Sequence, residues 1–127
     1  ALLHVTGTVK LDSTVAIGGI VQMASGVGLR IRAVAGAGPH AIALPDWTLV
    51  VNATAAAAVN LPTAASAYNA TTGVGQVFNV KCKGLSAFAT TVTANGAELI
   101  DGSAVPVALA AAANLNIQSD GTGWIVL

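Results

Sequence analysis

Residues 47–55 read WTLVVNATA, and this stretch defines the strand pattern on which the rest of the chain is built. Successive side chains of a β-strand point to opposite faces of the sheet. One face therefore carries the larger apolar side chains, which are Trp47, Leu49, Val51 and Ala53. The opposite face carries Thr48, Val50 and Asn52. The pattern predicts a strand with one buried face and places Trp47 in the core.

Short runs of the same kind continue towards the C-terminus. They are rich in Val, Ile and Thr and are separated by turn residues: 59–64 (VNLPTA), 74–83 (VGQVFNVKCK), 87–94 (AFATTVTA), 103–109 (SAVPVAL) and 115–127 (LNIQSDGTGWIVL). No segment sustains a helical apolar period, and the Ala-rich run 108–115 is short and uncapped, so we expect a turn there. The chain is therefore predicted to be all-β, a β-sandwich or barrel of short antiparallel strands, with Phe78 and Trp124 in its core.

Three dipeptides mark turns within this region: Asn95-Gly96, Asp101-Gly102 and Asp120-Gly121. Asn and Gly accept the positive φ angles of tight turns, and an Asp side chain can accept hydrogen bonds from nearby backbone N–H groups. Glu98 and Asp101 lie close enough in sequence to suggest paired carboxylates for acid–base chemistry. We favour the turn interpretation for Asp101 and Asp120, because each directly precedes Gly.

The N-terminal third carries weaker signals. Residues 5–26 predict two or three short strands, and residues 27–34 alternate so that Leu29, Ile31 and Ala33 form a buried face while Arg30 and Arg32 form a basic outer face. A Gly- and Pro-rich loop follows, and Pro45 marks a break. We therefore predict an N-terminal β arm or subdomain over residues 1–45, used for attachment or oligomer contacts, and a β-sandwich module over residues 46–127.

Composition narrows the classes of function. The chain has 127 residues, of which 54% are hydrophobic and only 8% are charged, and its formal net charge is zero. A neutral chain exerts no long-range attraction on nucleic acid or on an anionic membrane, and its high hydrophobicity argues against disorder. The longest uncharged stretch, 47–80, contains Asn, Pro and Gly, so no membrane span is expected. So little charge predicts that much of the surface is buried against other copies of the chain.

Candidate chemistry is sparse. The single cysteine, Cys82, alternates with Phe78 and Val80 and is predicted to be a small buried residue. His4 and His40 are far apart in sequence, and His40 follows a Gly-Pro turn. We therefore predict no catalytic, cofactor-binding or metal-binding residues, and we do not expect an enzyme. Arg30, Arg32 and His40 remain as possible interface residues, with the arginines either exposed or paired across a subunit boundary.

The order of motifs from Trp47 to Leu127 resembles a theme of tailed-bacteriophage virion proteins. The residues that carry the resemblance are WTLVVNATA, VNLPTA, GQVFNVKCKG, TVTANGAELIDG, VPVAL and LNIQSDGTGWIVL. Such modules occur in tail fibres and in small head or decoration proteins. The resemblance implies a β-rich, often trimeric protein that is structural or adhesive, and it transfers no catalytic residue to this chain.

Two functions follow from this resemblance. The first expectation is a capsid decoration or cement protein, a homotrimer that binds the major capsid protein lattice on the outer surface of the virion and stabilises the head. The alternative is a tail-fibre or receptor-binding module whose loops contact host glycans. Either protein would be made in the cytoplasm of the bacterial host.

Overall fold

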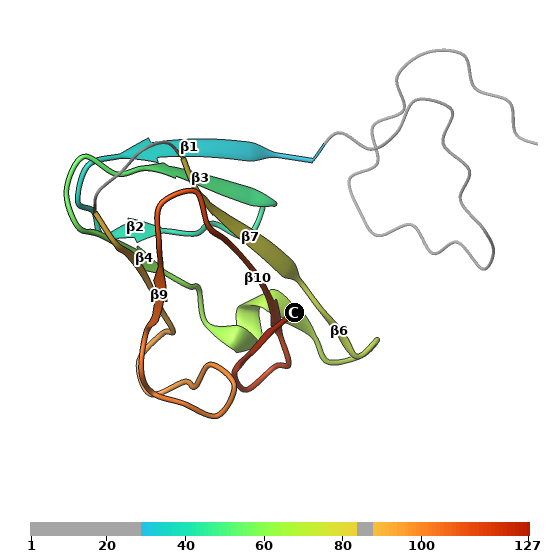
Figure 1. Cartoon of the computed structure of the whole chain (residues 1–127). Helices are drawn as coiled ribbons and strands as arrows, with labels where there is room; N and C mark the ends of the chain where they lie inside the picture. The colour runs from blue at the N-terminus through green and yellow to red at the C-terminus, as the bar shows by residue number, and fades with distance from the viewer. Residues whose placement is uncertain (1–28, 84–87) are drawn as a thin grey trace, which may run out of the picture.

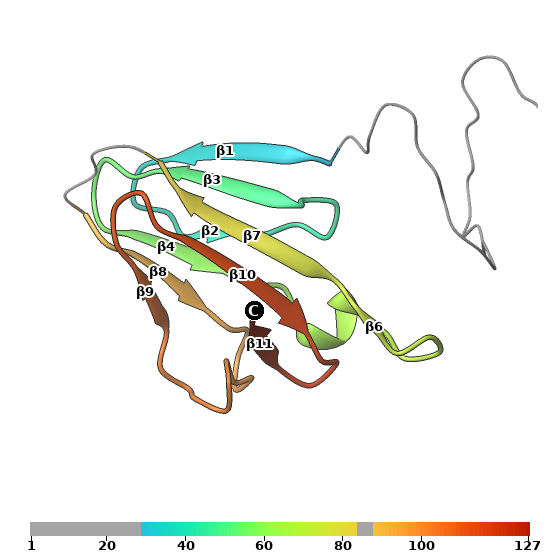
Figure 2. The same cartoon turned by 45° about the vertical axis from the view of Figure 1, so that its right-hand side comes forward.

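The computed structural model describes residues 29–83 and 88–127 of the chain, and these residues fold into two packed β-sheets (Figures 1 and 2). The five-stranded sheet contains, in spatial order, β1 (Ile31–Ala35), β3 (Thr48–Asn52), β7 (Val77–Cys82), β10 (Asn114–Ser119) and β11 (Trp124–Val126). The four-stranded sheet contains β2 (His40–Ala41), β4 (Ala57–Asn60), β8 (Thr90–Thr93) and β9 (Val107–Leu109). The prediction of an all-β fold is confirmed.

Two smaller elements lie between β4 and β7. The 3-10 turn η1 (Ala64–Ala67) is followed by a hairpin of β5 (Tyr68–Asn69) and β6 (Val74–Gly75). Gly75 lies so close to β10 that an added Cβ would be 1.7 Å from the Ser119 carbonyl oxygen. Only glycine fits there, so the hairpin is held directly against the five-stranded sheet.

Successive strands alternate between the two sheets. The chain passes from β1 to β2, from β3 to β4 and from β7 to β8, and each return to a sheet adds a strand parallel to the previous one. We call these three strand pairs coils. Within the two main sheets of the described residues, antiparallel pairing involves the last strands, β9, β10 and β11, and the β5–β6 hairpin is antiparallel as well.

The predicted antiparallel arrangement is therefore wrong for the first half of the fold. Parallel neighbours require a crossover connection, and here the crossover is a strand of the opposite sheet. Turn residues show where a strand ends, but they do not show which sheet the chain enters next.

The core lies between the two sheets. Phe78 and Trp124 are each only 1% exposed, and their ring centroids are 5.8 Å apart. Leu49, Val51 and Val59 are equally buried, and Cys82 is 3% exposed. The alternation within β3 and β7 explains this burial, because every second side chain of each strand faces the other sheet.

Trp47 does not belong to this core, and its prediction was wrong. Its side chain is 40% exposed. The strand begins one residue later, at Thr48, and the Trp47 N–H donates to the Arg30 carbonyl. The prediction extended the alternating pattern to the residue before the start of β3. At that position the opposite sheet no longer covers the side chain.

The two faces of β1 are inverted relative to the prediction. Ile31 is 68% exposed and Leu29 is 45% exposed, whereas Arg32 and Val34 are half-buried on the inner side. Ile31 lies opposite Thr48, and Arg32 lies opposite the buried Leu49. The physical reason is a buried carboxylate, that of Asp46, which draws Arg32 inward.

The boundary predicted between residues 45 and 46 does not divide the described part of the chain. β1 pairs with β3 and β2 pairs with β4, so strands from both sides of the boundary share both sheets. The strands predicted over residues 5–26 lie outside the described residues.

Candidate interaction surface

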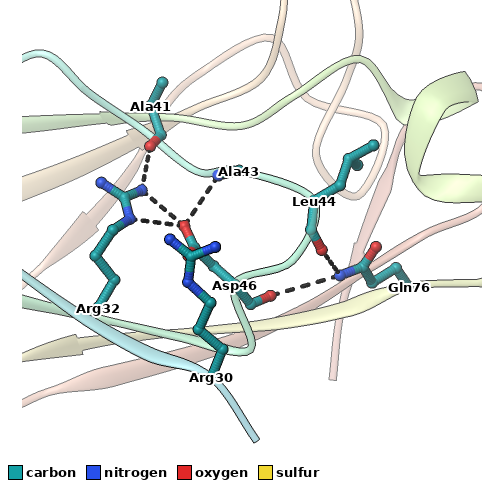
Figure 3. A network of polar contacts seen from close by, with 7 residues as sticks. All are labelled: Arg30, Arg32, Ala41, Ala43, Leu44, Asp46 and Gln76. Carbon is teal, nitrogen blue, oxygen red and sulfur yellow. Dashed lines mark hydrogen bonds and ion pairs between the residues drawn. The ribbon is translucent and has the colours of Figure 1, made fainter. Parts of the chain in front are cut away.

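One buried carboxylate organises the end of the sandwich where β1 begins (Figure 3). Asp46 is 1% exposed, and its Oδ2 accepts hydrogen bonds from Arg32 Nε at 2.9 Å, Arg32 Nη2 at 2.7 Å and Ala43 N at 3.0 Å. Arg30 Nε lies 3.4 Å from Asp46 Oδ1. Arg32 also donates to the Ala41 carbonyl oxygen. The cluster thereby joins β1, β2 and the turn before β3.

The protonation of Asp46 follows from these contacts. Burial raises the pKa of the Asp46 carboxyl group, but the hydrogen bonds from Arg32 and Ala43 and the positive charges of Arg32 and Arg30 together outweigh it. The pKa of Asp46 therefore lies below its ordinary value, and the carboxylate is charged at neutral pH. The basic outer face predicted for Arg30 and Arg32 is instead an ion-pair cluster within one chain.

His40 does not extend this cluster with its side chain. It begins β2 after the cis Gly38–Pro39 bond, and its Nε2 lies 3.3 Å from the Gly36 carbonyl oxygen. Its side chain is half-buried. The three predicted interface residues are thus used, at least in part, to hold β1 and β2 in place.

The other acidic side chains among the described residues hold loops. Glu98 accepts hydrogen bonds from Ala64 N at 2.9 Å and from Trp124 Nε1 at 3.2 Å. Asp101 Oδ1 accepts from Val126 N at 3.0 Å. Both carboxylates are thus occupied by backbone or indole N–H donors.

The predicted turns differ in type. Asp101 and Gly102 both have positive φ, 49° and 75°, and the flanking Ile100 and Ser103 exchange two backbone hydrogen bonds, as in a tight hairpin. At Asn95-Gly96 only Gly96 has positive φ, 56°, and the Asn95 carbonyl accepts from Glu98 N. This second turn opens the loop between β8 and β9 and does not join adjacent strands.

Asp120 and Gly121 form the β10–β11 turn. Asp120 Oδ1 accepts hydrogen bonds from Thr122 N at 2.8 Å and Gly123 N at 2.6 Å, and Gly121 has φ of 94°. The backbone N–H of Thr122 is the largest influence on this carboxyl group and, with that of Gly123, lowers its pKa. Sequence reasoning missed a similar turn at Asn69, whose Oδ1 accepts from Thr71 N and Thr72 N.

A hollow of about 580 Å³ lies between the loops that these turns form. Its walls come from the segments before Asp101-Gly102 and after Asp120: Ala97, Glu98, Leu99, Asp101, Gly102, Asp120, Thr122, Gly123, Trp124 and Ile125. Trp124 is 1% exposed, so it offers no aromatic face to a ligand, whereas Leu99 and Ile125 are more than 40% exposed.

A further candidate surface is the outer face of the five-stranded sheet. One row across it consists of Ile31, Thr48, Asn79 and Asn116, and the next of Ala33, Val50, Lys81 and Asn114. Asn79 Nδ2 donates to Asn116 Oδ1 at 2.6 Å, and Lys81 Nζ donates to the Ala112 carbonyl oxygen at 2.5 Å. We call these eight residues the amide face. Its one charged residue, Lys81, is already hydrogen-bonded to the loop before β10.

No group of three or more His, Cys, Asp or Glu side chains that could hold a metal ion occurs in residues 29–83 and 88–127. In the same residues, no helix is long and apolar enough to cross a membrane. No family model, curated protein or solved structure matches the chain.

Proposed function

We propose that this chain is a non-enzymatic structural protein of a bacteriophage virion, a homotrimeric decoration protein that binds the major capsid protein lattice through its amide face. The sequence resemblance from Trp47 to Leu127 supports the class of protein. The observation that carries the proposal is the internal use of charge. Arg30, Arg32, Asp46, Lys81, Glu98, Asp101 and Asp120 all make polar contacts within the chain.

This use of charge matters because desolvating a free charge opposes association. A face of Ile, Ala, Val, Thr and Asn side chains carries little such cost, and its amides can still form hydrogen bonds across an interface. Stable interfaces are depleted of charged residues at their centres. Among its eight residues the amide face has one charged side chain, that of Lys81, which bonds within the chain, and its small side chains allow close approach of a flat partner.

The proposal is tested with the intact chain. Light scattering after size-exclusion chromatography should give three times the mass of the chain, and the protein should co-sediment with phage heads that lack decoration protein. Asn116→Lys, which places a charge on the β10 side of the amide face, should reduce co-sedimentation by at least about tenfold. The matched control is Ala108→Lys, on the exposed side of the four-stranded sheet. A soluble monomer with no affinity for heads contradicts the proposal.

The second candidate, a tail-fibre module that contacts host glycans, is favoured by the hollow between the two loops. Its rim offers Asp101, Asp120 and Thr122 as partners for sugar hydroxyl groups. A glycan array separates the two functions, because specific binding that is lost in Thr122→Ala and kept in Asn116→Lys favours the receptor-binding module.

A further inference from the structure

Both sheets end on the same side of the molecule in a strand with a free edge. Within the described ranges 29–83 and 88–127, β1 pairs only with β3, and β2 pairs only with β4. The side chain of Arg32, on β1, reaches the Ala41 carbonyl on β2, so the two edges adjoin (Figure 3). The Arg30 carbonyl accepts from Trp47 and Thr48 N–H. Alternation therefore directs the backbone groups of Ile31, Ala33 and Ala35 towards the free edge.

The β1 edge has little protection of its own, because its one charged side chain, that of Arg32, is turned inward and bound to Asp46. Natural proteins guard exposed edges with charged side chains, Pro, bulges or very short strands. β1 has five residues in regular register with β3, and the side chains on its outer side belong to Ile31, Ala33 and Ala35. Ile31 is 68% exposed. Such an edge is suited to pairing with one more parallel strand.

The register of the first two coils predicts which residues would pair there. Ile31 lies opposite Thr48, 17 positions further along the chain, and His40 lies opposite Val59, 19 positions further along. The same two offsets, applied before β1, place residues 14–18 opposite Ile31–Ala35 and residues 21–22 opposite His40–Ala41.

The sequence TVAIGGIVQ, residues 14–22, fits these positions. Val15 and Ile17 fall opposite Arg32 and Val34, which face inward, and Thr14 and Ala16 fall opposite residues that face outward. Gly19 falls opposite Gly36, whose φ of 85° is needed for the turn between β1 and β2.

The second half of the segment fits equally well. Val21 falls opposite His40, in the row of the buried Val59, and Gln22 falls opposite Ala41, in the row of the exposed Asn60. In this register Val15, Ile17 and Val21 would face inward, and Thr14, Ala16 and Gln22 would face outward.

We propose that residues 14–22 of the same chain dock on the free edges of β1 and β2 as a further parallel coil. The occupant is the chain's own segment because the connection has the right length. Residues 23–30 lead from it to β1, just as residues 42–47 lead from β2 to β3. The apolar side chains of Val15, Ile17 and Val21 extend the core by one layer. This inference is independent of the proposed function.

A disulfide tests the register. Neighbouring strands are about 5 Å apart, within the range that a disulfide bridges, so the double variant Ala16→Cys/Ala33→Cys should form an intrachain disulfide on mild oxidation. Native Cys82 is 3% exposed and stays reduced. Val15→Cys/Ala33→Cys is the matched control, since its two side chains point to opposite faces. Equal cross-linking in both variants, or none in the first, overturns the proposal.

An experiment that mixes two single-cysteine variants distinguishes docking within one chain from docking on a second copy of the chain. Single variants Ala16→Cys and Ala33→Cys, carrying tags of different mass, should give no mixed disulfide after co-refolding and oxidation. A mixed disulfide would place the segment on a neighbouring copy and overturn docking within one chain.

Hydrogen exchange on the full chain provides a test that needs no cysteine. The amide of Ala33 should be protected, and Val15→Pro should speed its exchange by about tenfold or more, whereas Leu3→Pro should not. Rapid exchange of Ala33 in the unaltered chain contradicts the proposal.

Discussion

The carboxylate of Glu98 accepts a hydrogen bond from the buried indole Nε1 of Trp124 at 3.2 Å. The same carboxylate accepts from Ala64 N at the start of η1. One half-buried side chain therefore joins the loop after β8, the last strand β11 and η1, three segments that are far apart in sequence. This contact explains why an acidic residue lies next to the largest core side chain.

Replacing Glu98 by Ala should destabilise the fold. The change leaves the N–H groups of Trp124 and Ala64 without their acceptor, and an unsatisfied buried donor costs about 1–3 kcal/mol. Glu98→Gln keeps an acceptor oxygen and should lose less than half as much. Urea unfolding followed by Trp fluorescence measures both variants. Equal losses in the two variants would show that charge, not hydrogen bonding, is the important property.

Replacing Asp46 by Ala should be more damaging. Removing one partner of a fully buried ion pair costs about 3–5 kcal/mol. The side chains of Arg32 and Arg30 are 30% and 53% exposed, and water therefore reduces the expected loss to about 2–3 kcal/mol. Arg32→Ala should cost more than Arg30→Ala, because only Arg32 donates two hydrogen bonds to the carboxylate. The reverse order would contradict this account.

Acid should weaken the fold through the same carboxyl group. The pKa of Asp46 is lowered by folding, so its contribution is complete above the unfolded value of about 3.9 and is lost as the pH falls through the lower folded value. The free energy of unfolding should therefore decrease below about pH 4. Asp46→Asn should lower stability at pH 7 and flatten this acid dependence. Denaturant titrations from pH 7 to pH 2 test it, and parallel curves for the two proteins would exclude Asp46 as the cause.

Replacing Thr90 by Val should stabilise the fold or leave it unchanged. Thr90 is 1% exposed, and its hydroxyl group has no hydrogen-bond partner among the described residues. Val has nearly the same shape, so the change removes a desolvated hydroxyl group at a gain of up to about 1 kcal/mol. The control is Thr91→Val, whose hydroxyl group bonds to the Ala57 carbonyl at 3.4 Å. A drop in the unfolding midpoint for Thr90→Val alone would reveal a missed partner.

The sequence was sufficient to predict strands where one face of a strand is fully covered. In β7, Phe78, Val80 and Cys82 alternate with Val77, Asn79 and Lys81, and burial follows the same period. The turns at Asp101 and Asp120 were also predictable, because their side chains act on the nearest backbone groups. Such local signals do not depend on what lies across the sheet.

Other features depended on partners that are distant in sequence. Arg32 faces inward because Asp46 is buried beside it, although hydrophobicity alone favours the opposite face of β1. Similarly, the parallel pairing of β3 with β7 spans η1 and the β5–β6 hairpin, which carry no sign of it. The amide face likewise depends on the alignment of strands from four places in the sequence.

The order in which the coils and the last strands add to the two sheets also determines when the chain can complete its fold. β7 is paired on one side with β3 and on the other with β10, and β10 is completed by β11, which contains the core residue Trp124 and ends at Val126. When paired strands are far apart in the sequence, the chain loses loop-closure entropy before the contacts between the strands form, and this slows folding. During synthesis the core therefore stays open until β11 has left the ribosome.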